Sequence, residues 1–214
     1  MEIVMPAGAN KDFSIGEAYR FGWQATWANI GFLLGFMVLA LVIQYLPGLL
    51  SEATKDLPLV SVFLSIFSFV INVIVGMGFV KTGLRLASNE KGDLSDLYAH
   101  WPLFLRFLGV TILSGLAVMG GFLLLIIPGI IIAIRLQFAQ YLLVDKNTGV
   151  MESLKKSWEM TKGVTLKLFL FGLVGILINL AGFLCLIIGL LAAIPTTLIA
   201  SAYVYKKFLS GVTN

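Results

Sequence analysis

The chain has 214 residues, of which 59% are hydrophobic and 12% are charged, and its formal net charge at pH 7 is +4. This composition lies far outside the averages of soluble proteins, so a lipid bilayer is the expected solvent. The positive charge would indicate nucleic acid only if it gathered on a soluble domain, and the sequence leaves no room for one of useful size.

Apolar stretches predict six transmembrane helices, since crossing a hydrocarbon core of about 30 Å takes roughly 20 apolar residues in a helix. Pro128 and Gly129 divide one very long apolar block, because proline lacks an N–H donor and clashes with the preceding turn. Gly189 divides the last block similarly and leaves Pro195 inside the sixth helix. The predicted spans are about 29–50, 58–80, 103–127, 129–144, 165–188 and 190–205.

The basic residues predict how these helices are threaded, because lysine and arginine are retained on the cytoplasmic side of short loops. With the amino terminus inside, the inner segments hold nearly all of them and the outer segments hold only Lys55. Tryptophan favours the membrane interface, and Trp23, Trp27, Trp101 and Trp158 all lie just before spans on this inner side. We therefore expect both termini in the cytoplasm.

A short stretch of mixed polarity precedes each odd-numbered span: GEAYRFGWQ, SDLYAHWPL and ESLKKSWEM. Their apolar residues recur at helical spacing, which predicts short amphipathic helices in the inner interface. GFLLLIIPG at 121 and GFLCLIIGL at 182 also match each other. The sequence thus predicts one all-α polytopic domain over 1–214, built from three repeats of an amphipathic helix and a transmembrane hairpin, at about 14–87, 93–145 and 150–207.

The stretch from Ile126 to Gly163 resembles a family of uncharacterised bacterial integral membrane proteins, which includes a membrane domain fused to some glycerophosphodiester phosphodiesterases. The resemblance implies a six-helix protein of the bacterial inner membrane. It implies no catalysis, since the phosphodiesterase domain of the fused relatives is absent from this sequence. The residues that carry it are Pro128, Gly129, Arg135, Leu142, Leu143, Val144, Asp145, Ser157, Trp158, Lys162 and Gly163.

Arg135 is a charged residue in the fourth predicted span, six residues beyond the predicted hairpin tip, or about 9 Å at 1.5 Å per residue. One interpretation is structural: the side chain snorkels to the outer headgroups or pairs with Glu52 or Asp56. The other is a site for an anionic group such as a lipid phosphate, with Gln44 and Gln137 as neutral donors. We keep both.

A basic set precedes the fifth span, with Lys155, Lys156 and Lys162 close to Trp158. These side chains could recruit anionic lipid headgroups or an acidic partner at the inner leaflet. They could also do no more than fix the topology, with nearby glutamates neutralising part of their charge.

The sequence lacks the residue patterns of intramembrane chemistry. Metalloproteases need paired histidines, and this chain has only His100; paired carboxylates are also missing, because no aspartate or glutamate lies inside a predicted span. There is no glycine-rich phosphate loop either. We therefore expect no enzymatic activity, no cofactor and no metal.

The function that the sequence favours is that of a non-enzymatic inner-membrane protein that binds lipid or another anionic ligand, or that supports a membrane partner. The expected partners are membrane lipids, a membrane protein or further copies of the chain. The alternative is a transporter or channel for a small or lipidic solute, which short or interrupted helices also suggest.

Overall fold

The computed structural model describes residues 12–54, 56–185 and 189–210, and every regular element in these ranges is a helix. This agrees with the predicted all-α class. In chain order the elements are α1 (Ile15–Ala28), α2 (Ile30–Ala53), α3 (Pro58–Ala87), the 3-10 helices η1 (Leu94–Leu97) and η2 (Trp101–Leu103), α4 (Phe104–Leu124), α5 (Ile126–Leu136), α6 (Ala139–Lys146), α7 (Val150–Met160), α8 (Thr165–Leu184) and α9 (Leu190–Ser210).

Five segments of the described chain are long and apolar enough to cross a membrane, and they correspond to the first five predicted spans. They are α2, α3, the segment from η1 to the end of α4, α5 together with α6, and α8. The sixth predicted span, about 190–205, folds as α9 but is not among these five. Polar residues such as Thr196, Thr197 and Ser201 make α9 less apolar. A sixth span stays a prediction.

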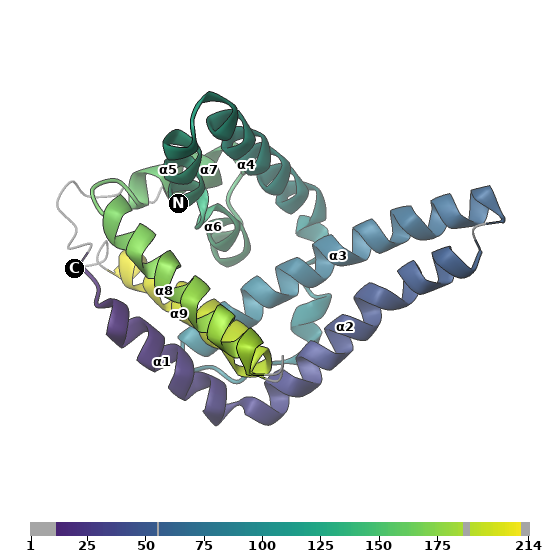
Figure 1. Ribbon diagram of the computed structural model, residues 1–214, viewed down its shortest axis with the longest axis horizontal. Coiled ribbons are helices and arrows are strands. Elements are labelled where there is room, and N and C mark those ends of the chain that lie inside the picture. Colours follow the sequence, from purple (N-terminus) through teal and green to yellow (C-terminus); the bar gives the residue numbers. More distant parts are fainter. Residues whose placement is uncertain (1–11, 55, 186–188, 211–214) are drawn as a thin grey trace.

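Helix α9 is the centre of the arrangement, where it packs against α1, α3 and α8. Figure 1 shows α1 alongside α8 and α9, and the α2–α3 hairpin projecting away from the rest of the molecule. The main core lies where α6 meets α3 and α9. Its fully buried side chains include Phe138, Leu142, Leu143 and Tyr205.

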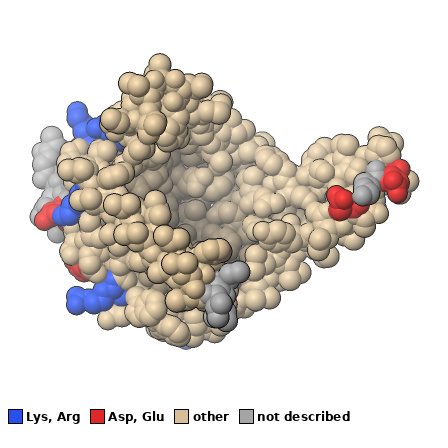
Figure 2. Space-filling view, in the orientation of Figure 1, with Lys and Arg blue, Asp and Glu red and all other residues tan. Residues whose placement is uncertain are grey.

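Charged side chains on the face shown in Figure 2 lie at its two ends. Lysines and arginines gather at the edge opposite the α2–α3 hairpin, and acidic side chains gather at the tip of that hairpin. The surface between them carries no charged side chain in this view. An uncharged belt of this kind is what the hydrocarbon core of a bilayer requires.

In each of two helical hairpins, α4–α5 and α8–α9, a pair of glycines lies in close contact. A Cβ on Gly121 would lie 2.9 Å from the Cα of Gly129, and a Cβ on Gly182 would lie 2.9 Å from the carbonyl oxygen of Gly189. Only glycine allows the helices to approach this closely. Both pairs fall in the matching stretches GFLLLIIPG and GFLCLIIGL, so this sequence similarity coincides with a similar close approach.

The turn between α4 and α5 lies at Leu125, and the predicted position at Pro128 and Gly129 is wrong. Leu125 has an extended backbone, with φ −164° and ψ 156°. Pro128 is the third residue of α5. In the first turn of a helix the backbone N–H has no intrahelical partner, so proline is tolerated there.

The second of the three predicted amphipathic helices is also wrong, because residues 94–103 form two 3-10 turns. Asp93 begins η1 by accepting a hydrogen bond from the Ser95 N–H at 2.8 Å. Asp96, only 3% exposed, turns inward and pairs with Arg85 of α3 at 2.9 Å. A tight 3-10 turn brings this carboxylate toward α3.

Small and polar residues join α1 to α9. A Cβ on Gly22 would overlap the carbonyl oxygen of Thr196. The Thr196 hydroxyl donates to the hydroxyl of Thr26 at 3.2 Å, and both threonines are buried. The absent side chain at position 22 therefore sets how closely these helices pack.

We predict that Gly22→Ala destabilises the protein by about 1–3 kcal/mol, because the added methyl group overpacks the α1–α9 contact. Thermal unfolding of the detergent-purified protein would show this as a lower midpoint. The matched control is Gly31→Ala in α2, where a Cβ meets nothing within 4 Å. Its midpoint should stay the same or rise, since alanine favours the helix by about 1 kcal/mol. Equal midpoints for the two variants would contradict the close contact.

Candidate functional site

Arg135 lies in the last turn of α5, and its guanidinium stands 4.7 Å from the centre of the Trp158 ring of α7. This is a cation–π contact, in which the face of the indole attracts the positive charge. The observed neighbour of the guanidinium is thus Trp158, and not Glu52 or Asp56, while snorkelling to the outer headgroups stays a prediction. The Arg135 Nε is buried and has no hydrogen-bond partner in the described residues.

The fourth predicted span is broken directly after Arg135, between the end of α5 at Leu136 and the start of α6 at Ala139. The hydroxyl of Ser157 in α7 donates to the Arg135 carbonyl oxygen at 2.7 Å and accepts from the Phe138 N–H at 3.2 Å. The Thr161 hydroxyl, just beyond α7, lies 3.3 Å from the same carbonyl oxygen but is closer, at 2.9 Å, to the Ser157 carbonyl oxygen. The Ser157 hydroxyl thus replaces backbone hydrogen bonds that the break removes.

The two glutamines predicted as neutral donors do not meet at Arg135. The side-chain amide of Gln137 donates to the Ile134 carbonyl oxygen within its own segment, at 2.9 Å. Gln44 lies in α2, which packs on α3 and α9, whereas Arg135 lies in α5, which packs on α4, α7 and α8. Figure 1 shows α2 and α5 in separate parts of the molecule. The structure therefore brings Trp158, and not Gln44, to Arg135.

A groove with a cavity volume of about 380 Å³ runs beside this pair, between α4, α5 and α7. Its walls are aliphatic, and its rim carries the ring of Trp158 together with the charged side chains of Lys155 and Glu159. The sequence analysis named Lys155 and Trp158 but missed the aliphatic walls. These are Leu113 and Ala117 of α4, Ile132 and Leu136 of α5, and Leu154 of α7.

The three lysines of the basic set have different surroundings. Lys155 is exposed on the groove rim, and Lys162 is exposed just beyond α7. Lys156 is buried and donates to the carboxylate of Glu152, one turn earlier. This hydrogen bond, together with one from the Gly149 N–H, holds the pKa of Glu152 below its usual range. Lys156 therefore has a structural contact, while Lys155 faces the groove.

Four of the residues that carry the family resemblance lie in α6, next to the core: Leu142, Leu143, Val144 and Asp145. Leu142 and Leu143 are fully buried. The carboxylate of Asp145 accepts from the Tyr205 hydroxyl at 3.1 Å and from the Lys206 ammonium at 2.9 Å. The sequence analysis gave Asp145 no role, although an acidic residue at the end of an apolar run needs a partner. These residues fix α6 to α9.

The described part of the chain contains no group of three or more His, Cys, Asp or Glu residues placed to hold a metal ion. The groove has a single carboxylate, that of Glu159. The groove thus combines apolar walls with charged groups at one edge.

The chain is similar to parts of longer bacterial proteins. It is 32% identical over 110 residues to the uncharacterized protein Rv2560 of Mycobacterium tuberculosis and to the uncharacterized protein Mb2590 of Mycobacterium bovis, over 50% of this chain and 34% of each relative. It is 27% identical over 99 residues to the UPF0259 membrane protein PC1_1998 of Pectobacterium carotovorum, over 45% of this chain and 40% of that protein. The matches thus span about a third to two fifths of these relatives.

No protein-family model matches the chain, and no solved structure matches it. The similarity to a membrane protein and the apolar helices together support a membrane location with several membrane-spanning helices. The resemblance to the membrane domain that is fused to some glycerophosphodiester phosphodiesterases stays a prediction.

We predict that Ser157→Ala lowers the free energy of unfolding by about 1–3 kcal/mol, because it leaves the Arg135 carbonyl and the Phe138 N–H without their partner. Thermal unfolding in detergent measures the change. The matched control is Ser61→Ala, whose hydroxyl donates to the Pro58 carbonyl oxygen in the exposed first turn of α3. A Ser157 variant as stable as the Ser61 variant would show that the hydroxyl does not support the break.

Proposed function

We propose that this chain is a non-enzymatic integral membrane protein of the bacterial inner membrane, and that it binds a lipid with an anionic headgroup in the groove between α4, α5 and α7. The observation that carries the proposal is the pairing, in one groove, of aliphatic walls with the cationic rim at Lys155. An acyl chain would lie along the walls, and the headgroup would lie at the rim.

The charges around α7 favour an anion. On and around α7 the chain has four cationic side chains, those of Arg135, Lys155, Lys156 and Lys162, and two carboxylates, those of Glu152 and Glu159. One lysine and one glutamate pair with each other, as Lys156 does with Glu152. The remaining excess is positive, and each such charge near a membrane surface attracts anionic lipid by about 1 kcal/mol.

Arg135 adds hydrogen-bonding capacity behind the rim. Its guanidinium is covered on one face by Trp158, and its Nε has no partner among the described residues. A guanidinium can donate five hydrogen bonds in a planar fork that suits phosphate oxygens. A headgroup phosphate drawn to Lys155 would lie near the Trp158 ring and hence near this donor.

The proposal includes the threading that the basic residues predict. Six spans, counting α9, would cross the bilayer as three repeated units with both termini in the cytoplasm. The charge-free belt in Figure 2 and the five apolar helices support this placement. The apolar sides of the projecting α2–α3 hairpin would then face bilayer lipid, a membrane protein partner or a second copy of the chain.

A second candidate function is transport of a small or lipidic solute, which the break between α5 and α6 favours. Discontinuous membrane helices form substrate sites in many transporters, because the break frees backbone groups to bind the solute. Here the Ser157 hydroxyl already occupies the freed Arg135 carbonyl. That occupancy makes lipid binding the better-supported function.

We predict that the wild-type protein retains phosphatidylglycerol through purification and that Lys155→Gln reduces its occupancy about fivefold, the effect of a contact of about 1 kcal/mol. Ala117→Trp, which fills the apolar part of the groove, should abolish retention. Native mass spectrometry of the purified protein measures the occupancy.

The control for the lipid measurement is Lys91→Gln, because Lys91 lines a separate cavity beside α1 and α3. This variant should keep the wild-type occupancy. If all three variants retain the lipid equally, lipid does not bind in the α7 groove. Solute uptake into proteoliposomes, abolished by Ala117→Trp, would instead favour the transporter.

The threading predicts opposite accessibility for two turns. On a Cys185→Ser background, which removes the exposed native cysteine, Asp56→Cys should react with a membrane-impermeant thiol reagent in spheroplasts. Ser88→Cys should react only after the membrane is permeabilised, because it follows α3 on the predicted inner side. Labelling of Ser88→Cys in sealed spheroplasts would refute the orientation.

A further inference from the structure

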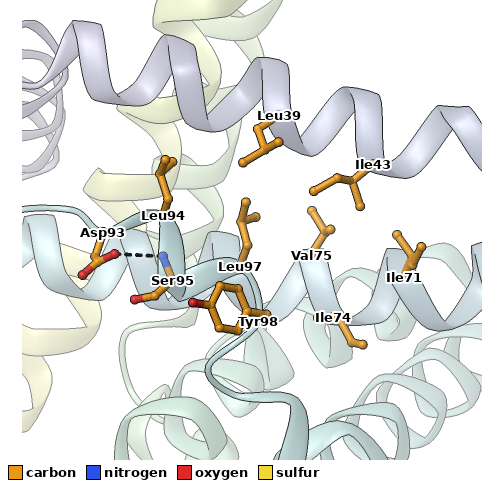
Figure 3. A pocket seen from close by; sticks show the side chains of 10 residues that line it. All are labelled: Leu39, Ile43, Ile71, Ile74, Val75, Asp93, Leu94, Ser95, Leu97 and Tyr98. Atoms are coloured by element: carbon orange, nitrogen blue, oxygen red, sulfur yellow. Dashed lines mark hydrogen bonds between the residues drawn. The ribbon is translucent and has the colours of Figure 1, made fainter.

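A second cavity, with a volume of about 410 Å³, lies between the α2–α3 hairpin and the 3-10 helix η1. Figure 3 shows aliphatic side chains at one end of this cavity, with Ile43 from α2 and Ile71 from α3, and polar groups at the other end. Helix α3 and η1 pack closely here, since a Cβ on Gly78 would lie 2.8 Å from the Cα of Leu97. The volume falls within the range of about 300–1,000 Å³ typical of small-molecule sites.

The polar end consists of the Asp93 carboxylate and the hydroxyls of Ser95 and Tyr98. Asp93 accepts a hydrogen bond from the Ser95 N–H at 2.8 Å. This backbone hydrogen bond, with a further one from the Ser95 side chain, holds the pKa of the Asp93 carboxyl below its usual range. The carboxylate is therefore ionised at neutral pH, and it has further lone pairs for a donor.

Asp93 is the one charged residue among those that line this cavity. No lysine or arginine is among the residues that line the cavity. Arg85 is the cation whose charge acts on Asp93, and its guanidinium is bound by Asp96 at 2.9 Å and by Glu90 at 3.6 Å. Lys91, two residues before Asp93, lines a separate cavity beside α1. A positive group at Asp93 would meet an ionised partner, whereas a phosphate or carboxylate without a positive group beside it would be repelled. The charged group of this cavity, the Asp93 carboxylate, is thus opposite in sign to the Lys155 ammonium at the rim of the α7 groove.

We propose that this cavity binds a cationic amphiphile, with its ammonium group at Asp93, Ser95 and Tyr98 and its aliphatic chain running toward Ile43 and Ile71. The carboxylate at the polar end of the cavity is complementary to the positive head of such a molecule, and the aliphatic end is complementary to its tail. The shared chemistry is an ammonium on a long aliphatic chain, supplied by an amine-bearing membrane lipid or by a free long-chain amine. The site is independent of the α7 groove.

Photo-crosslinking in reconstituted phosphatidylcholine vesicles tests the proposal. The probe is a long-chain amine that carries a diazirine in its alkyl chain, and the comparison is the fatty acid with the same diazirine chain. We expect the amine to label peptides from α2 and α3 that line the cavity, with the fatty acid labelling them about tenfold less. Unlabelled phosphatidylethanolamine that displaces the amine would identify a lipid as the source, and a lack of displacement would identify the free amine.

Two variants and two matched controls locate the site. Asp93→Asn keeps an acceptor for the Ser95 N–H but removes the charge, so it should reduce amine labelling about tenfold. Leu39→Trp, at a residue that lines the cavity, should block labelling by the chain. Asp56→Asn at the hairpin tip and Leu41→Trp on the exposed side of α2 should label like wild type.

Equal labelling by the amine and the fatty acid, or amine labelling that survives Asp93→Asn, would overturn the proposal. Lys155→Gln should leave amine labelling unchanged, because it alters only the α7 groove. A loss of phosphatidylglycerol retention would contradict only the proposed function of the α7 groove. A loss of amine labelling would contradict only the proposed site at Asp93.

Discussion

A buried backbone group needs a hydrogen-bond partner, above all where lipid surrounds the protein and water is scarce. The break between α5 and α6 creates this need, and the Ser157 hydroxyl meets it by bonding the Arg135 carbonyl and the Phe138 N–H. With that contact made, α6 can turn into the core, where Leu142 and Leu143 are fully buried. The same contact holds α7 against α5, which places Trp158 over Arg135 and completes the wall of the groove.

Hydropathy and length were sufficient to predict most of the helices. The thickness of a bilayer fixes how long an apolar helix must be, so α2, α3, α4 and α8 could be expected from composition alone. The amphipathic stretches at α1 and α7 were also predicted as helices. The turn at Leu125 has no clear signal in the sequence, because Pro128 resembles a helix breaker although proline fits the first turn of a helix. Residues 94–103 were misjudged because their helical spacing is also compatible with successive 3-10 turns.

The site could be predicted only in part, because its residues meet through tertiary packing. Arg135 and Trp158 were both singled out, but helical geometry within a single span could not show that α7 folds back over α5. The pairing of Arg85 with Asp96 is hidden in the same way, since it depends on η1 turning toward α3. The aliphatic groove walls have no sequence signature, because every apolar helix offers such residues. The sequence shows that Arg135 is a charged residue in an apolar helix, but it does not show that Trp158 is its partner.

The packing of α1 on α9 has a consequence for biogenesis. The hydrogen bond between Thr26 and Thr196 joins residues that are 170 positions apart in the sequence. Nearly every helix must therefore be synthesised before this contact can form. Until then the face of α1 around Gly22 stays uncovered at the membrane surface. Non-local contacts of this kind close late and leave intermediates open to wrong pairings. Insertion of this protein is therefore expected to end with a docking step, and a stalled or shortened translation product would expose α1 to membrane chaperones and proteases.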